Sequence, residues 1–172
     1  MEQATPDDAA EIAALRTTVA RELTREHGNG HWSAAVTERG AHRALRHARV
    51  YVAREAARIV ATLALATKKP WAIDVRYFTA CPRPLYLLDM AVAPDRQRTG
   101  IGRRCLSEAA ARARAWPAQA IRLDAYDHAA GAGSFYARCG YREVGRVVYR
   151  GVPLIYYELR LPDHPTEAVP CR

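Results

Sequence analysis

The sequence predicts an α/β protein with a mixed sheet flanked by helices. Segments with the helical repeat of apolar residues alternate with short apolar runs of strand length, in the order ααββ–β–α–β–α–ββ. With 172 residues, the chain is long enough to bury about 68–70% of its unfolded surface in one core. We expect a single domain over residues 1–161 and a flexible tail over residues 162–172, which contain three prolines.

The first two helices are predicted from capping signals and periodicity. Thr5 can cap a helix, Pro6 suits its first position, and Asp8 stands where a capping-box acid belongs. The apolar stripe of this helix consists of Ile12, Leu15, Val19 and Leu23. Gly28 ends the helix, and a second helix is expected over residues 33–47.

Three strands are expected next. The segments ARVYVARE (residues 48–55) and ARIVATLALAT (residues 57–67) predict two strands joined by a turn. A long connection with several aromatic residues follows over residues 68–84. The segment LYLLDMAVAP (residues 85–94) then predicts a short apolar strand that carries one acid, Asp89.

The second half of the chain repeats the alternation. One helical face is formed by Ile101, Cys105, Leu106, Ala109, Ala113 and Trp116. Pro117 ends that helix, and AIRLDAYD (residues 120–127) predicts the next strand. A short helix follows within residues 130–141, and residues 142–161 alternate like a hairpin that turns near residues 151–153.

The net positive charge of the chain bears on which kinds of binding partner are expected. The net charge is +8, and 24 of the 26 basic residues are arginines, whose planar guanidinium suits phosphate and carboxylate groups. Most of these arginines are spread evenly along the chain, which favours a solvated basic surface over a nucleic-acid interface. Neither an RRM signature nor a paired Cys/His finger is present, so no nucleic-acid partner is expected.

Cysteine usage and hydropathy predict a cytoplasmic protein without a metal. The four cysteines, at positions 81, 105, 139 and 171, form no CxxC pair, which favours neither a disulfide framework nor a zinc site. His27 and His31 lack further ligands at suitable spacing, so no metal site is expected there. No apolar run approaches the roughly 20 residues of a membrane span, and the N-terminus lacks the pattern of a signal peptide.

The segment DRQRTGIGRRC (residues 95–105) predicts a phosphate site. Four arginines surround two glycines where a helix begins, although positive side chains there oppose the helix dipole by about 0.3–1 kcal/mol each. Free backbone amides at a helix N-terminus bind phosphate, and glycines permit its close approach. The P-loop pattern is absent, and a dinucleotide fingerprint is disfavoured because Cys105 replaces its third glycine.

Two motifs together resemble those of the GCN5-related N-acetyltransferases (GNAT). MAVAPDRQRTGIGRRCL contains a match to the Gln/Arg-x-x-Gly-x-Gly/Ala core of that family's acetyl-CoA motif, with Gln97, Gly100 and Gly102 at its defining positions. SFYARCGY (residues 134–141) resembles the second hallmark, an aromatic–Tyr pair followed by Gly and an aromatic residue. The resemblance extends from the first helix to about residue 161 and implies a GNAT-like fold, with two parallel strands that splay apart.

The resemblance also implies the cosubstrate and its binding residues. Acetyl-CoA would lie between the strands at residues 85–93 and 120–127. Backbone groups of Met90, Ala91 and Val92 would bond the pantetheine arm and the thioester carbonyl. Gln97 would open the pyrophosphate loop, whose amides are those of Arg98, Thr99, Gly100, Ile101, Gly102 and Arg103.

Three side chains are candidates for the chemistry that the resemblance implies. Tyr136 matches the tyrosine that serves as acid for the departing thiolate, and its alternative role is packing of the short helix. Asp124 and Asp89 match positions where relatives carry acids, and either is a candidate base or a salt-bridge partner of an arginine. Ala129 stands where many relatives have asparagine, so the contact of that asparagine is not expected here.

The resemblance implies an N-acetyltransferase that acts on a primary amine. The acceptor is expected to be a small-molecule amine, with a protein N-terminus or lysine as the alternative. Residues 71–86 and the loop between the first two helices are expected to shape its pocket. A non-catalytic acyl-CoA-binding module is the alternative from another class, and the apolar final hairpin leaves a homodimer open.

Overall fold

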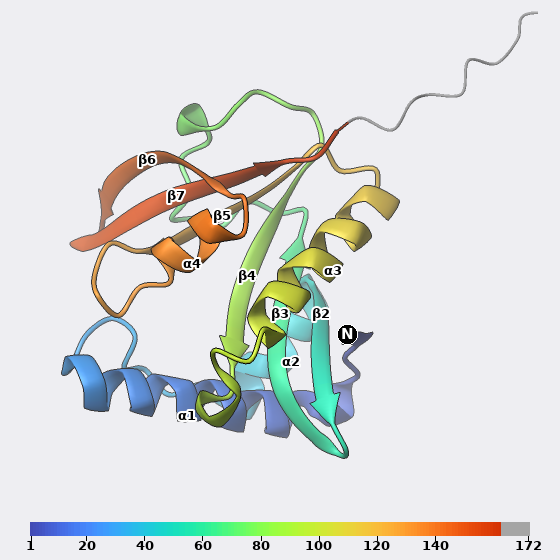
Figure 1. The fold of residues 1–172 in the computed structure, drawn as a ribbon, viewed down its shortest axis with the longest axis vertical. Helices are drawn as coiled ribbons and strands as arrows, with labels where there is room; N and C mark the ends of the chain where they lie inside the picture. The colour runs from blue at the N-terminus through green and yellow to red at the C-terminus, as the bar shows by residue number, and fades with distance from the viewer. Residues whose placement is uncertain (163–172) are drawn as a thin grey trace, which may run out of the picture.

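The computed structural model describes residues 1–162 and contains a seven-stranded mixed sheet in that range, in the order β1-β2-β3-β4-β5-β7-β6 (Figure 1). The strands are β1 (Glu2–Gln3), β2 (Arg49–Glu55), β3 (Arg58–Ala66), β4 (Pro84–Val92), β5 (Ala120–Tyr126), β6 (Arg142–Tyr149) and β7 (Val152–Arg160). All neighbouring strands are antiparallel except β4 and β5, which are parallel. The predicted fold class is therefore confirmed.

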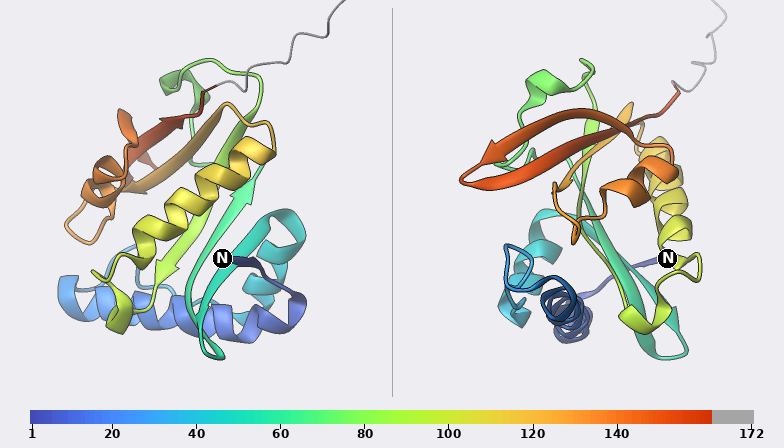
Figure 2. Two further views of the ribbon diagram at one scale, coloured as in Figure 1. Left: turned by 45° about the vertical axis from the view of Figure 1, so that its right-hand side comes forward. Right: turned by 60° about the vertical axis from the view of Figure 1, so that its left-hand side comes forward.

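Helices cover both faces of the sheet (Figure 2). They are α1 (Ala9–His27), α2 (Glu38–His47), α3 (Ile101–Ala115) and α4 (Gly133–Arg138). α1 and α2 pack on one face, around Ile12, Leu15 and Ile59, and α3 and α4 pack on the other. None of the helices in residues 1–162 is long and apolar enough to cross a bilayer. The tail predicted for residues 162–172 lies, beyond its first residue, outside the described range.

The two N-terminal helices differ in how closely they follow the sequence pattern. The predicted capping box is present, and the Thr5 amide donates to Asp8 Oδ2 at 2.8 Å before α1 begins. α2 is shorter than the predicted 33–47 and begins at Glu38 behind the cap Thr37. Residues 33–36 stay outside the helix because they bond to α1 instead: the Val36 amide donates to Thr17 Oγ1 at 3.0 Å.

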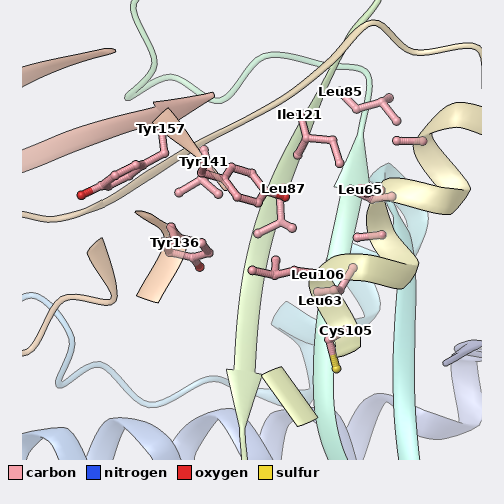
Figure 3. Close-up of a cluster of buried hydrophobic side chains, with 14 of the residues drawn as sticks. Leu63, Leu65, Leu85, Leu87, Cys105, Leu106, Ile121, Tyr136, Tyr141 and Tyr157 are labelled. Atoms are coloured by element: carbon pink, nitrogen blue, oxygen red, sulfur yellow. The ribbon is translucent and has the colours of Figure 1, made fainter. Parts of the chain in front are cut away.

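The amphipathic face predicted for the third helix is confirmed as a wall of the main core. Figure 3 shows Cys105 and Leu106 of α3 beside Leu63, Leu65 and Leu87 of the sheet. Each of these five side chains is buried. Burying a leucine of this kind stabilises the fold by about 1.5–3 kcal/mol. The same cluster continues into Tyr136, Tyr141 and Tyr157, so the core links α3 to α4.

Two parts of the sheet lie at its margins. β1 was not predicted, because two residues are too few to show a pattern; it pairs with Tyr51 and Val52 at the edge. The predicted final hairpin is confirmed as β6 and β7, turning at Arg150 and Gly151. Its apolar residues Leu154, Ile155, Tyr156 and Tyr157 are buried within this chain, because β7 lies between β5 and β6.

Candidate active site

The parallel strands β4 and β5 separate after a short stretch of pairing. They pair only at Pro84–Ala120, Leu85–Ile121 and Tyr86–Arg122. Beyond that point β4 stays paired with β3, but a bulge interrupts the register opposite residues 62–64 of β3. The bulge contains Asp89, whose φ of 55° lies in the left-handed region that aspartate tolerates better than most residues. Within residues 1–162, residues 87–92 of β4 therefore have no strand partner on the β5 side.

The loop that leads from β4 into α3 presents unpaired backbone amides. Arg98 (φ 63°) and Gly100 (φ 90°) both adopt left-handed conformations, with Gly100 as the N-cap of α3. The first amide of this turn with a backbone acceptor is that of Arg104, which donates to the Gly100 carbonyl at 3.0 Å. In the described part of the chain, the amides of residues 98–103 thus have no backbone acceptor. Such an array is a site for an anion.

Two side-chain hydrogen bonds fix this loop, and one of them attaches it to the end of β4. Gln97 Nε2 donates to the Val92 carbonyl at 3.2 Å, and Thr99 Oγ1 donates to the Arg96 carbonyl at 2.7 Å. Gln97 therefore fixes the loop through its side chain. The structure thereby gives a physical reason for glutamine at the first position of the motif.

The four arginines around the two glycines fall into two groups. Arg96 is paired with Glu55 at 2.6 Å and with Asp95 at 3.3 Å, and Asp95 is also paired with Arg58 at 2.8 Å. Arg98, Arg103 and Arg104 form no ion pair within residues 1–162 and are exposed. Only these three leave their positive charge available beside the unpaired amides.

The two sequence motifs meet in space at Gly102. A Cβ at this position would lie 3.1 Å from Cζ of Phe135 and 3.7 Å from Cε of Met90. The first turn of α3, the N-terminal part of α4 and the unpaired part of β4 therefore meet at Gly102. Any larger residue at position 102 would have to displace the Phe135 ring.

Tyr136 lies in the buried aromatic group that joins α4 to the sheet (Figure 3). Its ring is 5.8 Å from that of Tyr141 and 6.0 Å from that of Tyr157. Burial raises the pKa of its hydroxyl well above the usual value, and the nearby Asp124 and Cys139 raise it further. Within residues 1–162 that hydroxyl has no hydrogen-bond partner. Tyr136 therefore stays protonated near neutral pH and has a free hydrogen to donate.

Asp124 lies on β5, on the sheet face that carries α1 and α2. Burial raises the pKa of its carboxyl group above the ordinary value of 3.8, and its own backbone amide opposes that shift. It is half-buried and forms no ion pair with any residue from 1 to 162. A carboxylate of this kind has a raised proton affinity and remains reachable.

Asp89 is placed differently, although it lies on the adjacent strand. Its Oδ1 accepts a hydrogen bond from Arg16 Nη2 of α1 at 2.6 Å, and its side chain is exposed. The structure therefore leaves Asp89 exposed and ion-paired, whereas Asp124 is half-buried and near enough to Tyr136 to raise the pKa of its hydroxyl. Of the two interpretations of Asp89, the ion pair is the one with a partner in the structure.

Two tyrosines that the sequence did not single out flank Asp124. Tyr126 follows it by two residues on the same strand face and donates to the His31 carbonyl at 3.1 Å. Tyr156 is its cross-strand partner on β7 and is bonded to Ala72 and Asp74. Period-two spacing could have identified Tyr126, whereas only the strand register reveals Tyr156. Through them the loops expected to shape the acceptor pocket are attached on both sides of Asp124.

The arrangement defines a class of protein. A mixed sheet whose one parallel strand pair splays apart, beside the N-terminus of the next helix, is the fold of the acyl-CoA N-acyltransferases.

The comparison with protein families specifies that class. The family described as "Acetyltransferase (GNAT) domain" matches residues 46–143, which is more than half of the chain. The chain therefore belongs to the GNAT acetyltransferase domain family, as the two motifs predicted. No curated protein matches the sequence significantly.

Solved structures share the fold at low sequence identity. The structure of yncA from Salmonella typhimurium, with its cofactor acetyl-CoA, is 19% identical, covers 95% of this chain and 94% of its own, and has a TM-score of 0.68. Ribosomal-protein-alanine N-acetyltransferase from Brucella melitensis is 19% identical, with coverage of 93% and 98% and a TM-score of 0.69. Aminoglycoside 6'-acetyltransferase type Ii is 14% identical, with coverage of 95% and 98% and a TM-score of 0.68.

Proposed function

We propose that this protein transfers the acetyl group of acetyl-CoA to the primary amine of a small-molecule acceptor. One observation carries the proposal: β4 and β5 part beside six unpaired amides, and Asp124 of β5 lies near enough to Tyr136 of α4 to raise the pKa of its hydroxyl. Membership of the GNAT family and the acetyl-CoA in the yncA structure support the identity of the donor.

Backbone groups are assigned to hold the donor. The unpaired edge of β4 at Met90, Ala91 and Val92 offers hydrogen bonds to an extended pantetheine arm, as an additional strand would receive. The amides from Arg98 through Arg103 are directed at a pyrophosphate, and Gln97 fixes their loop. Arg98, Arg103 and Arg104 add positive charge that no carboxylate within residues 1–162 neutralises.

Asp124 and Tyr136 are assigned to the chemistry. Asp124 removes a proton from the acceptor amine, directly or through water, so that the nitrogen lone pair is free to attack. A carbon–nitrogen bond then forms as the carbon–sulfur bond breaks, and the sulfur leaves with the electron pair. Tyr136 donates its hydroxyl hydrogen bond to that sulfur as its charge develops. The nitrogen releases one proton and the CoA thiolate takes up one proton. The products are therefore the acetylated amine and CoA with a free thiol.

The test combines donor binding with turnover. Acetyl-CoA should raise the melting temperature, since a ligand of the folded state must stabilise it by RT ln(1 + [L]/Kd). A panel of primary amines, protein N-terminal peptides and lysine peptides should then be assayed for CoA release, with mass spectrometry of the product. Absence of any stabilisation would refute donor binding. Stabilisation without CoA release from any acceptor would instead indicate a non-catalytic acyl-CoA-binding module.

A further inference from the structure

The outer edge of β6 forms one margin of the sheet. β6 is the last strand in the sheet order and pairs with β7 on one side, and no strand within residues 1–162 pairs with its other side (Figure 1). An unpaired strand edge presents a row of free N–H and C=O groups that another strand can join. The two halves of β6 differ in how well they are protected against such pairing.

The first half of β6 carries the usual protection of an edge strand. A bulge interrupts the pairing with β7 between Glu143 and Gly145, and this half also carries the charged side chains of Arg142 and Arg146. Bulges and charged side chains discourage edge-to-edge association. The protection ends after Arg146, because residues 147–149 are Val, Val and Tyr.

The backbone of Val148 points away from β7. Val148 is opposite Pro153, and the Pro153 carbonyl accepts a hydrogen bond from the Asp127 amide at 3.0 Å, on the β5 side of β7. Because the N–H and C=O of a strand residue point to the same side, Val148 and Pro153 form a non-hydrogen-bonded pair. The N–H and C=O of Val148 are therefore directed toward the free edge.

The exposed large apolar side chains lie around this half of β6. Among the residues that the structure describes they are Trp71 (85%), Val148 (72%), Val75 (46%) and Tyr77 (44%). All four line a hollow of about 580 Å³ between residues 69–77 and the β6–β7 hairpin. Contiguous exposed apolar surface of this kind marks a site of interaction.

The edge is apolar on both faces of the sheet. Val147 and Tyr149 are two residues apart and line the hollow on one face. Val148, between them, points to the other face and borders the hollow through the edge of the strand. A partner that joins the edge itself covers both faces, whereas a partner that lies on one face leaves Val148 exposed.

We propose that the free edge of β6 is the interface of a homodimer, in which β6 pairs antiparallel with β6 of a second copy and the two Val148 residues are opposite each other. Their outward-directed backbones then exchange both N–H···O bonds, as in a hydrogen-bonded antiparallel pair. The two-fold axis is perpendicular to the sheet, so the same face of each copy lies on the same side. The two hollows, with Trp71 at each, therefore lie side by side.

The charges along the edge suit this register. Arg146 is paired with Asp127 at 2.8 Å and with Glu143 at 2.8 Å, so this group of three side chains has a net charge of −1. Arg150 forms no ion pair within residues 1–162 and lies 5.5 Å from the Tyr149 ring. With the axis at position 148, position 150 of one copy is opposite position 146 of the other. Each Arg150 therefore lies beside the acidic group of the other copy.

The surface is complementary to itself, which favours a second copy over any other strand. The acidic group at Arg146 and the free Arg150 are equally far from Val148, on opposite sides of it, so a turn of 180° about Val148 exchanges them. A stable interface buries about 800 Å² on each partner. The exposed parts of the four large apolar side chains around the hollow supply about half of that area, and the edge backbone and its neighbours supply the rest.

The first experiment measures the association of the full chain by sedimentation at physiological salt. We expect a dimer with a Kd of about 10 μM or lower. Val148→Pro removes the outward N–H without touching the β6–β7 ladder, and it should weaken the dimer about 30-fold or more. Val148→Thr, which keeps that N–H and the β-branched shape, should stay within about threefold. A wild type that is monomeric at about 100 μM would overturn the proposal.

The second experiment tests the register by cross-linking. The Cα atoms of a hydrogen-bonded antiparallel pair are about 5.5 Å apart, which is within disulfide range, so Val148→Cys should form a covalent dimer with oxidised glutathione. Arg142→Cys is the matched control on the same strand. In this register its two copies are about 40 Å apart, so it should give no more cross-linked dimer than the wild type with its native cysteines. Equal cross-linking of the two variants would contradict the register and, with it, the proposal.

Two exposed side chains test the interface without changing the strand backbone. Trp71→Ala and Arg150→Glu should each weaken the dimer about tenfold. Arg160→Glu, on exposed β7 surface away from the edge, should stay within about twofold. These variants decide the question even if Val148→Pro does not fold, which its melting temperature shows. A dimer that Trp71→Ala and Arg150→Glu both leave unchanged uses another surface, and the proposal is then wrong.

The interface is independent of the proposed function. Stabilisation by acetyl-CoA should be the same in Trp71→Ala as in the wild type, because the amide loop at residues 98–103 is remote from β6 in the sheet order. If acetyl-CoA gives no stabilisation but the dimer forms through Val148, donor binding fails and the interface stands. If acetyl-CoA stabilises a protein that remains monomeric, the interface fails and donor binding stands.

Discussion

Two groups of residues flank the point where β4 and β5 separate, and they offer different kinds of chemical group. We call them the α3 corner, which is the loop of residues 96–104, and the β5–α4 corner, which contains Asp124 and Tyr136. At the α3 corner, the candidate binding groups are backbone amides, positioned by left-handed residues and by a glycine that leaves room for Phe135. Its nearby carboxylates are paired, Asp95 with Arg58 and Asp89 with Arg16. At the β5–α4 corner, the candidate catalytic groups are two side chains, Asp124 and Tyr136, whose pKa values are raised by burial.

This difference is why we propose that the α3 corner binds the donor and that the β5–α4 corner carries the reaction. Backbone amides are rigid dipoles that cannot change protonation, so they suit a fixed anion such as pyrophosphate. Buried carboxyl and phenol groups without ion-pair partners can exchange or share a proton. Variants at the α3 corner should therefore change donor affinity, and variants at the β5–α4 corner should change turnover.

The largest effect is expected for Tyr136→Phe. Removing the hydroxyl leaves the ring packing intact but deprives the departing sulfur of its donor, so kcat should fall about 10²–10⁴-fold. The Kd for acetyl-CoA should stay within about twofold, because Tyr136 is outside the amide loop. Steady-state kinetics and calorimetry check both. If the affinity for acetyl-CoA fell together with kcat, donor binding and turnover would not be assigned to separate corners.

Asp124→Asn should lower kcat/KM about 10–100-fold, and the fall of kcat/KM at low pH should disappear from its pH profile. Because the base must be deprotonated, wild-type kcat/KM should rise with pH through a pKa above the ordinary 3.8. Asp89→Asn is the matched control and should change kcat/KM less than about threefold, since that carboxylate is paired with Arg16. Equal losses in the two variants would assign the chemistry to neither residue alone.

Asp124→Asn is expected to lower activity but to raise the stability of the folded protein at high pH. The pKa of Asp124 is higher in the folded protein than in the unfolded chain, so the folded state binds the proton more tightly. Stability is therefore lost as pH rises from about 3.8 through the folded pKa. Asp124→Asn should raise the melting temperature at pH 8 but not at pH 3, measured by scanning calorimetry. If Asp124→Asn melted at a lower temperature than the wild type at pH 8, the Asp124 carboxylate would not be a buried charge that destabilises the fold.

Gly100→Ala tests the backbone corner. A Cβ at φ 90° meets open space but strains the backbone by about 1–2 kcal/mol, and the amides should shift enough to weaken acetyl-CoA binding about tenfold. Gly151→Ala is the control, because it has a φ of 81° with open space in the β6–β7 turn. It should lose similar stability in urea unfolding and keep its affinity for acetyl-CoA.

The smallest effect is expected for the arginines. Arg98→Gln should weaken acetyl-CoA binding about two- to fivefold at low salt and less at high salt, as an exposed charge does. Arg96→Gln should leave binding nearly unchanged, because Arg96 is paired with Glu55 and Asp95. Titrations at two salt concentrations distinguish them. A larger loss for Arg96 would show that its ion pairs break when the donor binds.

The sequence alone determined the features that depend on local order. Helical periodicity identified α1 and α3, alternation identified the final hairpin, and the spacing of Gln97, Gly100 and Gly102 identified the amide loop. Local patterns failed where long-range contacts compete with them. Residues 33–36 left the predicted helix for hydrogen bonds to α1, and β1 is too short to produce a pattern.

Only the tertiary structure decided how the two acids differ and where the surface is hollowed. Asp89 and Asp124 look alike in sequence, as single acids within apolar strands; a bulge exposes Asp89 to Arg16, while Asp124 stays half-buried beside Tyr156. The hollow lined by residues 69–77, 147–149 and 156 joins segments about 75 positions apart in the chain, through strand register and the hydrogen bonds of Tyr156. Protonation and cavities arise from neighbours in space, and neighbours distant in the chain leave no local pattern.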